Sequence, residues 1–438
     1  MEWYFIAIIL FGSLFLLLFT GLPAAFCFTF INIAGGIFIL GGERGLHQLV
    51  LSIYESVSSF SLAPIPLFVF MGEILFHSGI GLIVIDAVDK AFFGRLPGRL
   101  SILTVATSAG LSAMSGSTVA TTALLGSLLL PEMRRRGYSK SMSMGPILGS
   151  GGLAIMIPPS GLIVVLGALA RISIGKMLIA AILPGLLMGA LYSSYIIIRC
   201  LLNPSLAPIY EVMPIPWSQK IISIIKSTVP VGLVFFLVVG LIILGIATPS
   251  EAAASGCFGS LLLTVLYRKL SLDLLKKATM GTLAITAMIF MIISGASGYS
   301  QILAFTGATR SLAEFAGGLP VPPILVIVAM LAVLFFLGMF MDQFAMMMIT
   351  LPVYMPIVQI FNLDPIWFGV MVLICLEIGF TSPPFGALLF VMKGVAPPDT
   401  TMMEIYGAAM PFIVCDITAI GLIMAFPAIA LWLPGLMF

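Results

Sequence analysis

The sequence predicts an all-α polytopic membrane protein, built as an inverted-topology repeat with two re-entrant helical hairpins and two broken helices. Three observations lead to this prediction. The 438 residues are 61% hydrophobic and only 8% charged. Helix-breaking residues recur at one constant offset, and basic residues gather around one copy of the repeat but not around the other. Together they indicate two related units that enter the membrane from opposite sides.

The composition excludes a soluble globular domain, because such domains carry charges on about a quarter of their residues. A net charge of +2 is too small to indicate nucleic acid, and we expect the chain to lie in the lipid bilayer. The five cysteines stand apart in apolar segments without CxxC spacing, so they are expected to be small packing residues. No basic region precedes the first apolar run, which is typical of a retained helix rather than a cleaved signal peptide.

The repeat relates residues 97–161 to residues 322–386, at an offset of 225. Prolines interrupt helices and glycines permit unusual backbone angles, so shared positions of these residues mean shared helix breaks. Chance alignment of apolar segments would match leucines without aligning several prolines. The matched positions are Pro97 and Pro322, Pro131 and Pro356, Pro158-Pro159 and Pro383-Pro384, and Gly161 and Gly386.

The predicted segments follow from these breaks and from the apolar runs between them. In chain order they are an N-terminal helix pair (1–44), a first repeat (45–200) with a scaffold arm 45–96, a hairpin 97–131 and a broken helix 141–170, a connecting polar segment with scaffold helices (201–270), and a second repeat (271–434) with a hairpin 322–356 and a broken helix 365–396.

The opening elements are predicted from length and polarity. Residues 3–20 and 23–41 are apolar runs of nearly 20 residues, which is enough to span a bilayer. The arm contains an amphipathic portion with Asp86, Asp89 and Lys90, which we expect at the membrane interface.

The first hairpin contains no charged residue from 100 to 131, and it is split by a polar tip at 112–118. Each leg has about a dozen residues, roughly 20 Å of helix, which is short of a ~30 Å hydrocarbon core. Its flanks carry Arg99 on one side and a basic cluster from Arg134 to Lys140 on the other. Both ends are therefore expected on the cytoplasmic side, with the tip inside the membrane.

The second hairpin has the tip 338–342 and no basic cluster, so it should open to the opposite side. Arg171 and Lys176 are the main exceptions to this charge pattern. Behind each hairpin lies a run long enough to cross the bilayer but interrupted by a Pro-Pro pair, which predicts a helix broken near mid-depth. A final apolar run, 404–434, closes the chain.

The breaks predict the chemistry. Backbone groups freed in hydrocarbon cost several kcal/mol each, so they persist where they line a cavity or bind something. Free carbonyls and hydroxyls are hard ligands for a small cation, and half-helix N-termini favour an anion. The first predicted cation site joins Ser115 and Thr118 with carbonyls near Ala154 and Ile157, and the second joins Gly338 with Gly379, Ser382 and Phe385. Substrate would lie between the tips, with Ser117, Pro158, Ser160, Asp342, Thr381 and Pro383 as candidate contacts.

Several alternatives stay open at this point. Serine and glycine in membrane helices often serve close packing, although a polar tip facing a Pro-Pro break in both halves favours binding. Asp342 and Glu377 are intramembrane carboxylates that could carry protons or hydrogen-bond to freed backbone. Ser297, within Gly-Ala-Ser-Gly, could be taken for a protease nucleophile, but no histidine follows position 77. A channel is the remaining rival.

The chain resembles the large membrane subunit (M subunit, DctM-like) of tripartite ATP-independent periplasmic (TRAP) transporters over essentially its whole length. The matching motifs are 66–73 (PLFVFMGE), 114–117 (MSGS) leading to 135–138 (RRGY), 157–160 (IPPS), 245–252 (GIATPSEA), and 338–342 (GMFMD) with 381–384 (TSPP). Together these motifs are specific.

The resemblance implies an elevator-type secondary transporter of the bacterial cytoplasmic (inner) membrane, driven by sodium ions and without another cofactor. It implies three partners: a small four-helix membrane subunit that the N-terminal helices contact, a periplasmic substrate-binding protein, and an organic anion such as a dicarboxylate, a sugar acid or a sialic acid. No enzyme activity is expected, and the absence of a Walker A sequence argues against ATP hydrolysis by this chain. Proton coupling through Asp342 or Glu377 is the alternative.

Overall fold

The computed structural model describes residues 3–81, 83, 96–115, 117–208, 225 and 229–437, with backbone alone at residue 3 and residues 112–115. Helices and turns make up this part of the chain, and it contains no β-strand. Five of its helices are long and apolar enough to cross a membrane, or six if a helix pair bent by 47° counts as one span. The structure thus confirms the all-α polytopic class. The portion around Asp86, Asp89 and Lys90 and most of 209–228 lie outside the described residues.

The elements before the second repeat are distributed as follows. They are α1 (Trp3–Phe19), α2 (Ala24–Phe38), α3 (Glu43–Val57), η1 (Phe60–Leu62), α4 (Pro64–His77), α6 (Arg99–Ser115), α7 (Thr118–Arg135), α8 (Lys140–Gly151), α9 (Leu153–Met156), α10 (Gly161–Leu169), α11 (Ile174–Ala180), α12 (Ile182–Leu202), η2 (Pro204–Leu206), α14 (Val229–Phe235), the π-helix η4 (Phe236–Gly240), α15 (Leu241–Ile243) and α16 (Pro249–Leu266).

The second repeat continues the chain with longer helices. They are α17 (Leu272–Phe305), α18 (Ala308–Gly318), α19 (Pro323–Gly338), α20 (Gln343–Ile360), α21 (Pro365–Thr381), α22 (Ala387–Val395), α23 (Met402–Ala425) and α24 (Ala428–Gly435). The predicted final run 404–434 is therefore two helices, because Pro427 cannot donate to the hydrogen-bond ladder of α23.

Helix bounds reproduce the 225-residue repeat. Adding 225 to the bounds of α7 gives those of α20, and the stretch from the start of α8 to the end of α9 corresponds in the same way to α21. The capping residues correspond too. The Ser117 hydroxyl accepts from the backbone N–H of Ala120 at 3.3 Å, and the Asp342 carboxylate accepts from that of Ala345 at 3.0 Å. Side-chain caps satisfy N–H groups that the first turn of a helix leaves free, so both repeats begin the second hairpin leg in the same way.

The hairpin legs are longer than the dozen residues predicted. They have 17, 18, 16 and 18 residues in α6, α7, α19 and α20, which is ~24–27 Å of helix. In α7 and α20 the added length arises because Pro131, Pro352 and Pro356 lie inside these helices and do not end them. Helix α6 continues to Ser115, into the predicted tip. Taken alone, α20 is long and apolar enough to cross a membrane.

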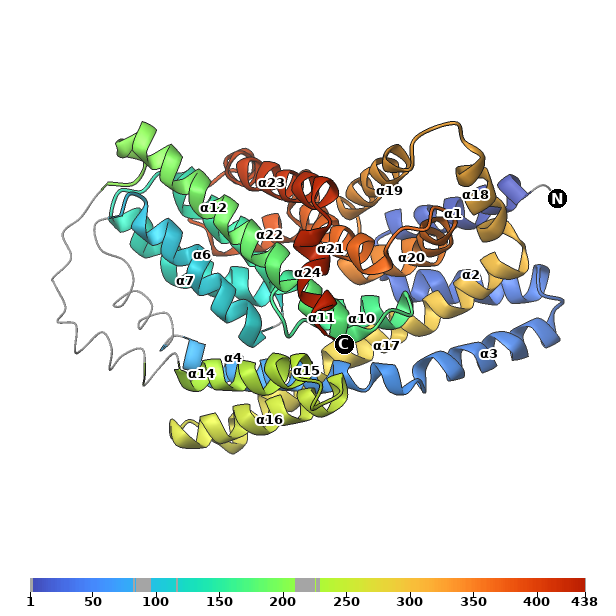
Figure 1. The fold of residues 1–438 in the computed structure, drawn as a ribbon, viewed down its shortest axis with the longest axis horizontal. Helices are drawn as coiled ribbons and strands as arrows, with labels where there is room; N and C mark the ends of the chain where they lie inside the picture. The colour runs from blue at the N-terminus through green and yellow to red at the C-terminus, as the bar shows by residue number, and fades with distance from the viewer. Residues whose placement is uncertain are drawn as a thin grey trace.

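The two broken helices run antiparallel. At the start of α8, Lys140 pairs with Asp399 and Glu404, which follow the end of α22. At the start of α21, Asp364 shares a cavity with Arg171, which follows the end of α10. The bases of the two hairpins therefore lie at opposite ends of the broken-helix pair, as the inverted repeat predicts. In Figure 1, α6 and α7 lie on one side of α21 and α10, and α19 and α20 lie on the other.

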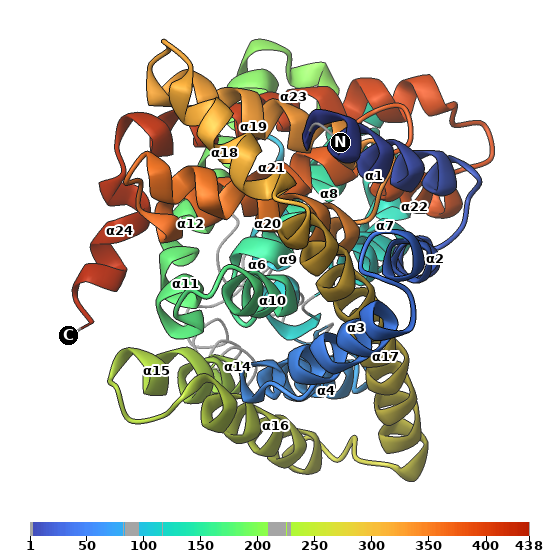
Figure 2. The same cartoon turned by 90° about the vertical axis from the view of Figure 1, so that its right-hand side faces the viewer.

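A separate layer of helices runs along one side of the repeat pair. It contains α3, α4, α14, α15 and α16, with α17 rising from it, in both Figure 1 and Figure 2. Helices α16 and α17 both pack on α4.

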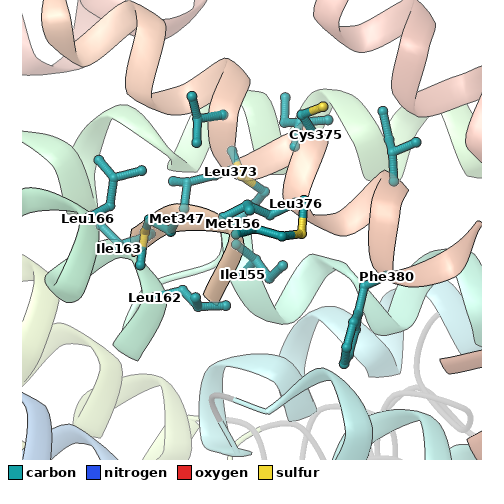
Figure 3. Close-up of a cluster of buried hydrophobic side chains, with 14 of the residues drawn as sticks. Ile155, Met156, Leu162, Ile163, Leu166, Met347, Leu373, Cys375, Leu376 and Phe380 are labelled. Atoms are coloured by element: carbon teal, nitrogen blue, oxygen red, sulfur yellow. The ribbon is translucent and has the colours of Figure 1, made fainter. Parts of the chain in front are cut away.

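The broken helices meet in a core that is almost entirely apolar. Figure 3 shows Ile155 and Met156 of α9 beside Leu373 and Leu376 of α21, all fully buried. In a bilayer the alternative environment is lipid, so dense packing rather than escape from water stabilises such contacts. This core holds the two breaks in fixed positions.

Candidate functional site

The tip of the first hairpin lies against the end of α8. Ser115 ends α6, but its side chain lies outside the described residues. Thr118 is buried at the start of α7, and its carbonyl oxygen would be 3.7 Å from a Cβ added to Gly151. That same Cβ would lie 2.2 Å from the Thr122 hydroxyl, so a side chain at position 151 would force Thr122 to move. Ser108 of the other leg donates a 2.6 Å hydrogen bond to the carbonyl of Ser150.

The two prolines of the first break leave backbone oxygens without hydrogen-bond donors. In a continuous helix the carbonyls of Ala154 and Ile155 would accept from residues 158 and 159, but both are prolines and have no N–H. Ile157 leaves the helix with an extended backbone, at φ −94° and ψ 113°. Helix α9, which holds Ala154, packs against both legs of the first hairpin.

The second break repeats this arrangement. Here Pro383 and Pro384 leave the carbonyls of Gly379 and Phe380 without their helical donors. Gly379 accepts only a looser bond from the N–H of Ser382, at 3.2 Å. Both Pro-Pro bonds are cis.

At the second tip, two glycines bring hairpin and broken helix into backbone contact. A Cβ on Gly338 would lie 2.5 Å from the Cα of Gly379, and a Cβ on Gly379 would lie 2.6 Å from the Cα of Gly338. Real Cβ atoms do not approach backbone so closely, so both positions require glycine. The structure therefore brings together two of the four residues in the second predicted cation site.

The remaining residues of that site lie on the same break. Ser382 is buried, and its hydroxyl donates to the carbonyl of Ile378 at 2.6 Å. A hydroxyl that donates its proton keeps its oxygen lone pairs free to accept a cation. Phe385 is 56% exposed, and its ring lies 5.6 Å from that of Phe340 in the tip.

The candidate substrate contacts differ in their burial and in their hydrogen bonds. Ser160 is buried, and its hydroxyl has no hydrogen-bond partner among the described residues. Thr381 is also buried, but it donates to the carbonyl of Glu377 at 2.8 Å. Ser117 and Asp342 cap their helices, while Pro158 and Pro383 form the breaks.

Sequence reasoning missed the contact that joins the two breaks. Glu377 is fully buried and accepts from the Gln343 amide at 3.4 Å, while its second oxygen has no partner in the described part of the chain. A Cβ on Gly152 would lie 2.2 Å from that second oxygen. Gly152 and Glu377 differ by 225 residues, so each is the repeat equivalent of the other. The offset could have indicated this pair.

Two other polar groups serve packing between helices. Asp416 accepts a short hydrogen bond from the buried Tyr192 hydroxyl. The Gly-Ala-Ser-Gly motif lies on α17 against α2, where Asn32 donates to the carbonyl of Gly295 at 2.6 Å. Its glycines serve the close approach of two helices.

The family described as "Tripartite ATP-independent periplasmic transporter, DctM component" matches residues 11–429. The chain belongs to this family. It is thus a transporter subunit of the bacterial inner membrane, and the resemblance read from its motifs is confirmed.

Relatives of this large permease cover nearly all of its length. The ectoine TRAP transporter large permease protein TeaC of Halomonas elongata is 29% identical, over 96% of this chain and 97% of the relative. The C4-dicarboxylate protein DctM of Pseudomonas aeruginosa is 29% identical over 91% of both chains. The sialic acid protein SiaM of Vibrio cholerae is 28% identical over 96% of this chain.

Solved structures support the fold alone. The Alcanivorax borkumensis YdaH transporter matches with a TM-score of 0.61 at 14% identity, over 89% of this chain and 91% of that one. Neisseria gonorrhoeae MtrF, whose structure illuminates a class of antimetabolite efflux pumps, matches with a TM-score of 0.61 at 12% identity, over 89% and 85%.

Proposed function

We propose that this large permease performs sodium-coupled uptake of an organic anion. One observation carries the proposal: in each repeat, a hairpin tip lies against a break whose Pro-Pro pair leaves two carbonyls without helical donors. Sodium is a hard cation that binds such oxygens, and freed backbone at membrane depth persists where it binds something.

Each repeat would supply one sodium site. The first combines Ser115 and Thr118 with the carbonyls of Ala154 and Ile157. In the second repeat, the oxygens of Gly338, Gly379, Ser382 and Phe385 would surround the ion. Bound sodium would pin each tip to its break and so complete the substrate site between the tips. Uptake then requires both ions, and the sodium gradient drives it.

The substrate and partners follow from the relatives. The relatives named above are permeases for ectoine, C4-dicarboxylates and sialic acid, all of which carry a carboxylate. We propose a carboxylate here as well, delivered by a periplasmic binding protein. The chain spans 66% of the isethionate permease protein DctMQ of Oleidesulfovibrio alaskensis, which leaves room there for a second subunit. For this chain, the second subunit would be a separate small membrane protein that contacts α1 and α2.

The movement we propose is an elevator. The hairpins pack directly on the broken helices, α7 on α8 and α19 on α21, so they would move as one body. The layer of α3, α4 and α14 to α16 would stay fixed with the small subunit.

Uptake in proteoliposomes tests the proposal directly. They would contain this chain and its small partner, with the binding protein outside, and candidate carboxylates would be scanned with and without a sodium gradient. We expect accumulation only with sodium. Uptake that ignores sodium but follows a pH gradient would overturn the ion assignment and move the coupling to Glu377, whose buried oxygen has no partner in the described residues.

A further inference from the structure

The two hairpin bases make equivalent junctions with opposite charge balance. At the cytoplasmic junction, Lys140 pairs with Asp399 at 3.2 Å and with Glu404 at 2.9 Å, and Arg134 lies 3.9 Å from Asp399. The cations are Arg134 at the end of α7 and Lys140 at the start of α8, and the anions are Asp399 in the loop after α22 and Glu404 in the first turn of α23. Charge is thus balanced within this junction.

At the outer junction the loop itself is basic. Arg171, on the loop after α10, and Lys176, in the first turn of α11, are exposed, and neither forms an ion pair with any described residue. The hairpin side offers Gln359, the repeat equivalent of Arg134, and Asp364. The Asp364 carboxylate accepts from the N–H groups of Ile366 and Trp367, so it is engaged at the start of α21.

A cavity of about 630 Å³ lies between the loop and the hairpin base. Arg171, Lys176 and Ser173 line one wall, and Gln359 and Asp364 line the other. This volume lies within the range of small-molecule sites. Two cations thus face a cavity on the side that the charge pattern of the hairpins predicts to be outer, where basic residues are normally sparse.

The backbone at Arg171 adds an independent argument. Its φ of +55° is a left-handed conformation that closes the end of α10, a position where glycine is ordinarily preferred. Arg268 has φ +54° in the same role, but it lies beside Lys269, Lys276 and Lys277 in a basic segment that the positive-inside rule predicts to be cytoplasmic. Arg171 lies on the predicted outer face, where positive charge is not expected. A basic side chain in this left-handed position therefore needs a different explanation.

We propose that this outer cavity binds the carboxylate of a small organic anion at Arg171 and Lys176. The guanidinium can hold a carboxylate with two parallel hydrogen bonds, and the ammonium adds a second charge. The site would collect the anion released at the outer face before it reaches the tips, and in that respect the inference rests on the proposed function.

Thiol chemistry tests the site without transport. The substitution Gln359→Cys places a thiol on the wall opposite the cations, while four native cysteines are buried and Cys415 is half-buried. Rates of modification would be compared for an anionic sulfonatoethyl and a cationic trimethylammonioethyl methanethiosulfonate, in nanodiscs without sodium. Relative to a free thiol, we expect the anionic reagent to be favoured about tenfold. Malonate at millimolar concentration should slow modification by the anionic reagent several-fold.

Charge removal gives the decisive comparison. The double substitution Arg171→Gln with Lys176→Gln should abolish both the preference and the protection by malonate. Arg310→Gln, which removes an exposed cation paired with Glu314 at 2.8 Å, should leave both intact. Ser173→Cys provides a second reporter on the loop side if the first variant does not fold.

Two results would overturn the proposal. One is a preference for the anionic reagent in the double variant that equals the preference in Gln359→Cys alone. The other is a preference that malonate does not reduce, because that would indicate a surface for an acidic protein rather than a site for a small anion. Neither result depends on sodium-coupled uptake, so failure of this site and failure of the proposed function remain distinguishable.

Discussion

The two repeats share their helix bounds but differ where each hairpin meets its broken helix. In the second repeat Gly338 and Gly379 touch through their backbones, whereas the equivalent of Gly379 in the first repeat is Ala154. The cap of the second leg is a hydroxyl at Ser117 and a carboxylate at Asp342. The repeated device is therefore the backbone break with its freed carbonyls, and the side chains around it have diverged. Substitutions can separate what the two halves share from what distinguishes them.

The largest effect is expected at the glycine contact. Gly379→Ala would place a Cβ 2.6 Å from the Cα of Gly338 and force the tip away from the break. Overpacking of this kind costs about 1–3 kcal/mol of stability, and uptake should fall on the order of 100-fold if the site geometry shifts by about 1 Å. Gly407→Ala is the matched control, since its Cβ would meet nothing within 4 Å. Equal uptake by the two variants would contradict a functional contact.

A smaller effect is expected from the ligand hydroxyl. Ser382→Ala should raise the sodium concentration for half-maximal uptake about tenfold, or ~1.4 kcal/mol, because one oxygen ligand is lost. Thr350→Val removes another buried hydroxyl that donates to its own helix, at 2.8 Å to Met346, and should leave the sodium dependence unchanged. Sodium titrations of uptake measure both variants, and identical curves would exclude Ser382 as a ligand.

The helix caps at the two tips should both contribute to the stability of the fold. Ser117→Ala and Asp342→Ala should each lower the free energy of unfolding by about 1 kcal/mol, because each removes a cap. Asp342→Asn keeps a capping oxygen and should restore stability. If that variant is stable but transports poorly, the charge of Asp342 acts on ions or substrate. If it transports normally, Asp342 is only a cap.

The smallest effect concerns pH at the cytoplasmic junction. The hydrogen bond from Lys140 lowers the pKa of the Asp399 carboxyl below its usual range. This carboxylate therefore stabilises the fold above about pH 3.9, its unfolded value, and the contribution is lost as the pH falls through the lower folded value. Asp399→Asn should make the unfolding temperature less sensitive to acid. Identical acid profiles for wild type and Asp399→Asn would contradict the pairing.

Prolines and glycines made much of this architecture predictable. Pro158-Pro159 and Pro383-Pro384 predicted both breaks, because a residue without an N–H interrupts the ladder wherever it stands. The leg lengths could not be obtained in this way, since Pro131 and Pro356 are tolerated inside their helices. Whether a proline ends a helix depends on its neighbours in space.

The contacts between elements were harder to predict. The tip at Gly338 and the break at Gly379 could be paired because both are irregular. By contrast, Gln343 is the first residue of α20 and Gly152 lies between α8 and α9, and the packing of α9, α20 and α21 brings them to Glu377. The sequence identified Glu377 as unusual, and the 225-residue offset relates it to Gly152, but no pattern in the sequence indicated the contact with Gln343.

The contact of Gly152 with Glu377 has an evolutionary consequence. A residue that touches its own repeat equivalent stands on the pseudo-twofold axis, so in an ancestor made of two identical chains it would have met a copy of itself. Two glutamates cannot occupy that point together, because a Cβ at position 152 already overlaps the Glu377 carboxylate. A single large acid on the axis therefore requires the two halves to differ at this position, which one gene carrying both halves permits. The contact is thus a point where the chain must depart from exact repeat symmetry.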